Sequence, residues 1–94
     1  MRQFKQHITI KQRNGLDKKS KIKWLQYSIK HGFYDIEATI GQIIEYLGDD
    51  LHGMNVTDKE GGGEWWWVIY GDVEFNADEL CDALFEAVKY KLKQ

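Results

Sequence analysis

The sequence predicts a single α+β domain over residues 1–94, in which helices pack on one face of a mostly antiparallel sheet. The expected order of elements is β-α-α-β-β-β-α. Three observations lead to this fold class. A chain of 94 residues without proline or internal repeats fits one domain. Apolar residues recur at helical spacing in some segments and alternate with polar ones in others. Glycines separate most of these segments, where they end helices and form turns.

The N-terminal third predicts one strand followed by one helix. Residues 4–11 alternate between apolar and polar side chains, which favours a strand. Asp17 or Ser20 is expected to cap the helix that follows, and Gly32 suits the position just after its last turn. Three apolar residues of this helix fall on one face at helical spacing: Ile22, Leu25 and Ile29.

The next segment fits two structures. Residues 34–40 alternate as a strand would, yet Asp35 would equally cap a helix whose isoleucines point inward. Thr39 and Gln42 have the spacing of a capping box, in which each side chain bonds to the backbone of the other residue. In both cases a helix is predicted through residues 42–47.

Three antiparallel strands are predicted next, at residues 54–60, 64–70 and 72–75. The three glycines at 61–63 would join the first two strands. Gly71-Asp72 is a two-residue hairpin signal between the second and third.

The last helix has the clearest pattern in the chain. Asn76 is expected to cap it, with Glu79 completing a capping box. Acids near its start and lysines near its end suit the helix dipole. Its expected apolar face consists of Leu80, Leu84, Ala87 and Val88.

The middle strand of the three is apolar on both faces. Because neighbouring side chains of a strand point to opposite sides, Trp65, Trp67 and Ile69 share one face. The other face carries Trp66, Val68 and Tyr70. The three predicted helices would cover one side of the sheet, which would leave an aromatic stripe for a partner or an oligomer interface. The alternative is that loops close the second side and both sets belong to the core.

Charge divides the chain into two parts. Residues 1–30 hold nine bases and one acid, a net charge of +8, whereas residues 31–94 hold four bases and fourteen acids, a net charge of −10. Between Asp35 and Glu86 the only base is Lys59. Either the two parts neutralise each other within the fold, or each presents a charged surface to a partner.

The acidic part, combined with the tryptophans, predicts a small protein-binding inhibitor. Its partner would be a protein with a basic surface, such as a nuclease, because charge steers encounter and aromatic side chains hold the complex. An immunity protein for a nuclease toxin fits this description, as does a phage-encoded inhibitor of a host defence or nucleic-acid enzyme. The alternative for the acids is an ordinary solvated surface. The expected contact residues are Trp66, Tyr70, Asp72, Glu74, Asp78, Asp82 and Glu86.

The basic part supports a different hypothesis, an accessory protein that binds nucleic acid. Lysines with a nearby aromatic ring contact phosphates and stack on bases. The candidate residues are Lys19, Lys23, Trp24 and Lys30. No zinc-finger, KH-type or RNA-recognition signature accompanies them. A third interpretation is self-association, with the two oppositely charged parts joining two copies as a homodimer or head to tail.

No pattern in the chain indicates catalysis, a metal or a cofactor. The three histidines are scattered, and residues 61–63 lack the Gly-Lys-Ser/Thr ending of a phosphate-binding loop. The single cysteine, Cys81, is expected to be a buried thiol. No apolar run has the length of a signal peptide or membrane span. A non-enzymatic, cytoplasmic protein without metal, cofactor or membrane contact is therefore expected.

Overall fold

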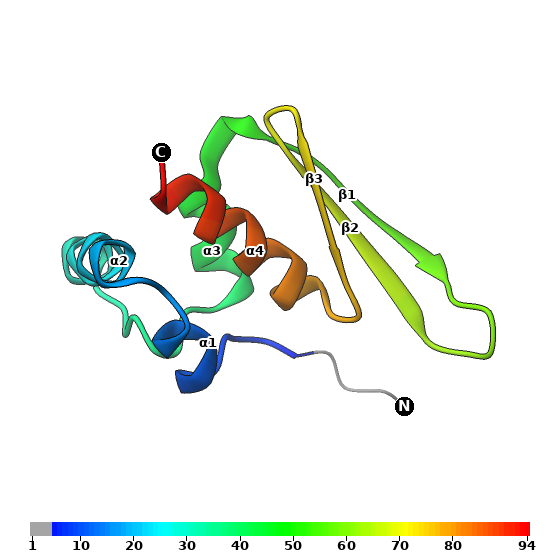
Figure 1. Cartoon of the computed structure of the whole chain (residues 1–94), viewed down its shortest axis with the longest axis horizontal. Helices are drawn as coiled ribbons and strands as arrows, with labels where there is room; N and C mark the ends of the chain where they lie inside the picture. The colour runs from blue at the N-terminus through cyan, green and yellow to red at the C-terminus, as the bar shows by residue number, and fades with distance from the viewer. Residues whose placement is uncertain (1–4) are drawn as a thin grey trace.

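Three antiparallel strands form one sheet in the order β1-β2-β3, and α4 packs against one of its faces (Figure 1). This is a computed structural model, and it describes residues 5–94. The small α+β domain predicted from the sequence is confirmed. Its elements are α1 (Ile10–Asn14), α2 (Lys18–His31), α3 (Ile40–Leu47), a 3₁₀ turn η1 (Gly48–Asp50), β1 (Leu51–Asp58), β2 (Glu64–Tyr70), β3 (Val73–Ala77) and α4 (Leu80–Leu92).

The predicted order of elements is confirmed, but its first strand shrinks to one antiparallel bridge between His7 and Thr39. The cause is a local signal stronger than the alternation. Thr9 accepts a hydrogen bond from the backbone of Gln12, and the Gln12 side chain bonds back to Thr9, so a capping box starts α1 at residue 10. Phe4, the first residue of the predicted strand, lies outside the described residues.

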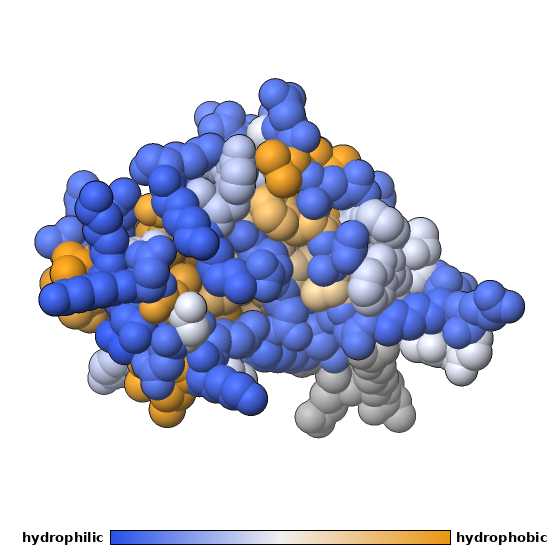
Figure 2. All heavy atoms as spheres, viewed as in Figure 1, coloured by the Kyte–Doolittle hydropathy of each residue, from blue (hydrophilic) through white to orange (hydrophobic). Residues whose placement is uncertain are grey.

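The ends of α2 are as predicted, but its buried face is not. Asp17 accepts a hydrogen bond from the Ser20 backbone at 2.8 Å, and Gly32 ends the helix at φ 74°. The buried residues of the helix are Ser20, Trp24 and Ser28. The predicted apolar face is wrong, because its three residues point outward and are 39–71% exposed: Ile22, Leu25 and Ile29. Figure 2 shows apolar side chains reaching the surface over α2, at the left of the view.

Residues 34–39 form neither a strand nor a helix, and Ile40 already belongs to α3. They make a turn that ends in an extended segment, where Ala38 is fully buried and its carbonyl accepts from Ile8 at 3.0 Å. The predicted capping box of Thr39 and Gln42 is present, so α3 begins at residue 40 and includes the helix predicted through 42–47. This connection ties the N-terminal segment to α3.

The sheet follows the predicted hairpins. Gly71-Asp72 is a two-residue turn between Tyr70 and Val73, which pair across it. The three glycines at 61–63 all have positive φ, between 88° and 105°, as a tight connection between β1 and β2 requires.

The helix α4 begins later than predicted. Asn76 pairs with Trp67 inside β3, so it caps no helix. Glu79 stands at the N-cap, but its side chain does not cap the helix and instead accepts a hydrogen bond from the Lys5 backbone at 3.3 Å. The predicted capping box is therefore wrong, because strand pairing extends β3 over its expected cap. The helix lies between the sheet and the helices α2 and α3. Its buried residues form the centre of the core: Cys81, Ala83, Leu84, Phe85, Ala87, Val88 and Leu92.

Candidate protein-binding surface

The strand β2 turns one face to the helices and the other away from them. Val68 and Tyr70 are 0% and 4% exposed beneath α4, and Trp66 packs against the same core. The opposite side of the sheet, here called the outer face, is not packed against α4. By strand register, the outer face consists of Gly53, Asn55, Thr57, Trp65, Trp67, Ile69, Glu74 and Asn76.

The aromatic rings of the outer face are held in fixed orientations. Trp65 and Trp67 meet edge to face, with ring centroids 6.4 Å apart. The Trp67 indole N–H donates to the Thr57 hydroxyl at 3.2 Å. The ammonium of Lys59 lies 4.8 Å from the centroid of the Trp65 ring. Ile69 continues the row and is 36% exposed. A partner would therefore meet a preorganised aromatic row.

Two predicted contact residues lie on the wrong side of the sheet for this surface. Tyr70 is buried with its ring against Tyr90, at 6.1 Å between centroids, and burial raises the pKa of its hydroxyl. Trp66 is half-buried in the core beneath the sheet. Sequence reasoning separated the two faces of β2 correctly and then chose the covered one. It did not single out Trp65, Trp67 and Ile69, the set that α4 leaves uncovered, because alternation alone does not say which set meets α4.

The predicted acids divide into two groups. Glu74 belongs to the outer face beside Ile69, and Asp72 is exposed in the adjacent turn. Asp78 is ion-paired with Lys59, the same lysine that lies over Trp65, so it borders the outer face. The structure thus brings three of the predicted acids to the aromatic row.

The other two predicted acids lie on α4 and are already bound within the chain. Asp82 accepts from Lys5 at 2.6 Å and from Gln12 at 2.8 Å. Glu86 pairs with Lys89 at 2.9 Å. The contacts of Asp82 tie the basic N-terminal segment to α4, and there the charges of the two parts neutralise each other within the fold. The Glu86–Lys89 pair lies within α4 itself.

The predicted nucleic-acid site loses its aromatic member. Trp24 is fully buried, and its indole N–H donates to the Asp35 carbonyl at 2.9 Å, so it cannot stack on a base. Lys23 donates to the carbonyl of Leu92 at 3.1 Å, which satisfies the C-terminal end of α4. Lys19 and Lys30 remain exposed on α2.

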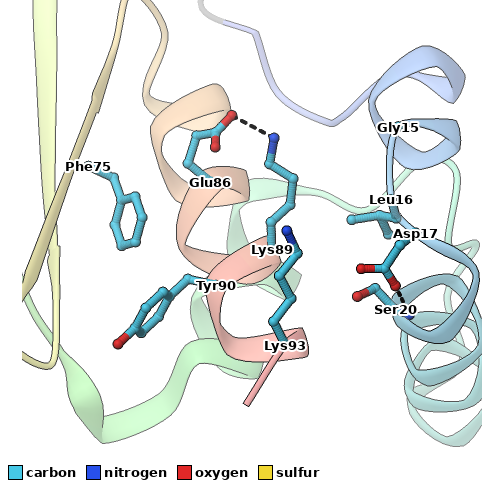
Figure 3. A pocket seen from close by; sticks show the side chains of 9 residues that line it. All are labelled: Gly15, Leu16, Asp17, Ser20, Phe75, Glu86, Lys89, Tyr90 and Lys93. Carbon is cyan, nitrogen blue, oxygen red and sulfur yellow. Dashed lines mark hydrogen bonds and ion pairs between the residues drawn. The ribbon is translucent and has the colours of Figure 1, made fainter.

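A groove of about 420 Å³ lies between α4 and the start of α2 (Figure 3). Figure 3 shows that its two carboxylates are engaged: Asp17 with Ser20, and Glu86 with Lys89. Hydrogen bonds from Ser20 hold the pKa of Asp17 below its usual value. No histidine or cysteine lines this groove. The groove therefore offers charged groups for contact rather than an arranged acid, base and nucleophile.

Cys81 is fully buried on α4, and burial raises the pKa of its thiol to about 11. Such a thiol is a poor nucleophile near neutral pH. Within residues 5–94, no cluster of three or more His, Cys, Asp or Glu side chains could hold a metal ion. Over the same residues, no helix combines the length and apolar character needed to cross a membrane.

Comparison of the chain with protein-family models, with curated proteins and with solved structures finds no match. The functional argument therefore rests on the outer face and its surroundings.

Proposed function

We propose that the protein is a small binding protein that inhibits a protein partner, and that its outer face docks on a basic surface of that partner. The observation that carries this proposal is the row Trp65, Trp67 and Ile69, which lies on the side of the sheet away from α4. Tryptophan is among the residue types most enriched in binding hot spots. Rings already fixed by neighbours lose little conformational entropy on binding.

The charge around the aromatic row supports a basic partner. From Leu51 to Ala77 the sequence carries one base, Lys59. The same segment carries five acids, namely Asp58, Glu60, Glu64, Asp72 and Glu74. A surface of this sign speeds encounter with a positively charged surface and disfavours acidic partners. Nucleases and other nucleic-acid enzymes present basic grooves to phosphate, so they are the class of target that this chemistry fits.

Replacing Trp67 with serine tests this assignment. We expect the variant to bind its partner at least about 30-fold more weakly, the loss typical of a hot-spot residue. The partner is first isolated by affinity capture from source-cell lysate, with and without nuclease digestion, and binding is then measured by surface plasmon resonance. The matched control is Ile22→Ser, an exposed apolar residue of α2, away from the sheet. Equal losses in both variants, or capture that disappears on digestion, would refute the proposal.

Glu74 of the outer face and Asp72 in the adjacent turn are expected to raise the rate of association with the partner. Replacing Asp72 and Glu74 together with asparagine and glutamine should slow association several-fold and flatten its dependence on salt, with dissociation nearly unchanged. Both side chains are exposed, so the free energy of unfolding should change little. Stopped-flow association at several ionic strengths measures this. An unchanged salt dependence would count against charge steering by this surface.

A further inference from the structure

The strand β1 is an unprotected edge of the sheet. It pairs with β2 on one side only, so alternate backbone N–H and C=O groups on its other side face outward. Met54 and Val56 are 43% and 47% exposed, although they point to the side of the sheet that α4 covers at β2 and β3. Figure 1 shows the β1–β2 hairpin extending beyond the helices. Backbone groups and apolar side chains along this edge are therefore open to a further strand.

The usual devices that protect an edge strand are missing from the middle of β1. Natural edges carry lysine, proline or inward-pointing charges, or they are very short. Residues 53–57 read Gly-Met-Asn-Val-Thr, without a charge or a proline. A bulge between Leu51 and Gly53 interrupts the strand at one end, and Asp58 closes the other. The other edge strand, β3, is shorter and carries the charged residue Glu74.

We infer that β1 is a dimerisation edge, on which two copies of the chain pair their β1 strands antiparallel about a two-fold axis at Asn55. In this register Met54 of each copy stands opposite Val56 of the other, and Gly53 stands opposite Thr57. The interface is isologous, since each contact occurs twice. The sheets of the two copies join into one continuous sheet, and both sides of each β1 strand are then paired with another strand.

The sequence of β1 selects this register among its neighbours. Moving the axis by one residue toward Met54 places Val56 at the bulge, beyond the regular part of the strand. Moving it toward Val56 places Met54 opposite Asp58. Each shift breaks the two Met54–Val56 pairs, whereas the axis at Asn55 keeps both and so sets apolar side chains against each other. A foreign peptide would not need this symmetry, so the self-complementary pattern favours a second copy as the occupant.

The dimer uses the edge of the sheet and leaves its outer face free, so it does not depend on the proposed function. It places two rows of Trp65, Trp67 and Ile69 on one surface. A partner with two matching sites would then gain affinity through the second contact.

The dimer is tested by light scattering on the purified full-length chain over a range of concentrations, without any partner. We expect a mass twice the 11.1 kDa of the monomer. Val56→Lys should weaken association at least ten-fold while the far-UV circular dichroism stays the same, because Val56 is exposed. The matched control is Ile29→Lys, which places the same charge at an exposed apolar residue of α2 and should remain dimeric. A monomeric wild type, or equal association of the two variants, would overturn the inference.

The register is tested by oxidative cross-linking. At the axis the two Asn55 Cβ atoms would lie about 4.5–5.5 Å apart, close to the separation of a disulfide. Asn55→Cys should therefore give a covalent dimer on mild oxidation. His52→Cys is the control, because its two copies would lie roughly 20 Å apart along the paired strands. Buried Cys81 is present in both variants. Faster cross-linking through position 52 than through position 55 would reject the register.

Discussion

Replacing Trp24 with alanine is expected to reduce the free energy of unfolding by about 3–5 kcal/mol, the cost of removing a large buried aromatic side chain. Trp24 is fully buried and is the largest side chain at the centre of the helical layer. Its ring lies within 6.2 Å, between centroids, of four other aromatic rings: Tyr27, Phe33, Tyr46 and Phe85. They come from α2, the turn after it, α3 and α4, so one ring holds these segments together.

A small domain has a total stability of only about 5–15 kcal/mol, so this loss should move the urea midpoint strongly. Far-UV circular dichroism follows the transition without depending on tryptophan fluorescence. Ile29→Ala serves as the control on the same helix. It removes a side chain that is 71% exposed and should change stability by about 0.5 kcal/mol or less. A loss below about 1 kcal/mol for Trp24→Ala would contradict the burial described above.

Trp24→Phe separates the contribution of the packed aromatic ring to stability from that of the indole hydrogen bond. Phenylalanine keeps an aromatic ring in the cluster but removes the indole N–H, which donates to the Asp35 carbonyl at 2.9 Å. The free energy of unfolding should fall by less than in the alanine variant, because the ring is kept and only the hydrogen bond to a partly buried carbonyl is lost, which costs about 1 kcal/mol.

Local chemical signals in this sequence predicted local structure well. Asp17 at the start of α2, Gly32 at its end and the Thr39–Gln42 capping box are all present. So is the two-residue turn at Gly71-Asp72. Each of these involves residues a few positions apart, and the outcome depends little on the rest of the chain. The same kind of signal was overlooked at Thr9 and Gln12, where it ends the predicted first strand.

Choices between two apolar faces were decided by tertiary packing. On α2 both the isoleucine stripe and the side of Trp24 are apolar enough to be buried. The core takes Trp24, with Ser20 and Ser28 one turn before and after it, because small neighbours let the helix approach closely enough to bury the ring. On β2, α4 covers Trp66, Val68 and Tyr70 rather than the alternate set. The spacing of apolar residues identifies the two faces of an element but does not show which of them is buried in the core.

The charges of the candidate site depended on contacts between distant segments. Lys5 and Asp82 are far apart in the sequence, and their ion pair neutralises the charge of one predicted contact acid. Lys59, the only base between Asp35 and Glu86, became informative only in three dimensions, since it joins Asp78 to Trp65. The sequence indicated an acidic and aromatic surface, and the fold determined which members share a face.

Raising the pH above about 9 is expected to destabilise the fold through the buried thiol of Cys81 and the partly buried hydroxyl of Tyr46. Burial raises the pKa of Cys81 from 9.0 to about 11. Burial, with smaller contributions from Tyr70 and Tyr27, raises the pKa of Tyr46 from 10.0 to about 12. Both shifts mean that the fold favours the neutral form over the anion. The stability that they contribute is fully present below the unfolded pKa values and is lost as the pH rises toward the folded ones.

Cys81→Ala shows how much of the decline in the free energy of unfolding at high pH comes from the Cys81 thiol. Because the pKa of Cys81 is raised from 9.0 to about 11 in the fold, the wild type is expected to lose about 2 kcal/mol of stability through this thiol between about pH 8 and about pH 11. Urea unfolding at a series of pH values should therefore show a steeper decline for the wild type than for the variant. The variant has a constant packing loss, which lowers its stability at every pH without changing the slope. Parallel profiles for the two proteins would show that the Cys81 thiol ionises in the folded state as readily as in the unfolded chain, which would contradict its burial beneath the sheet.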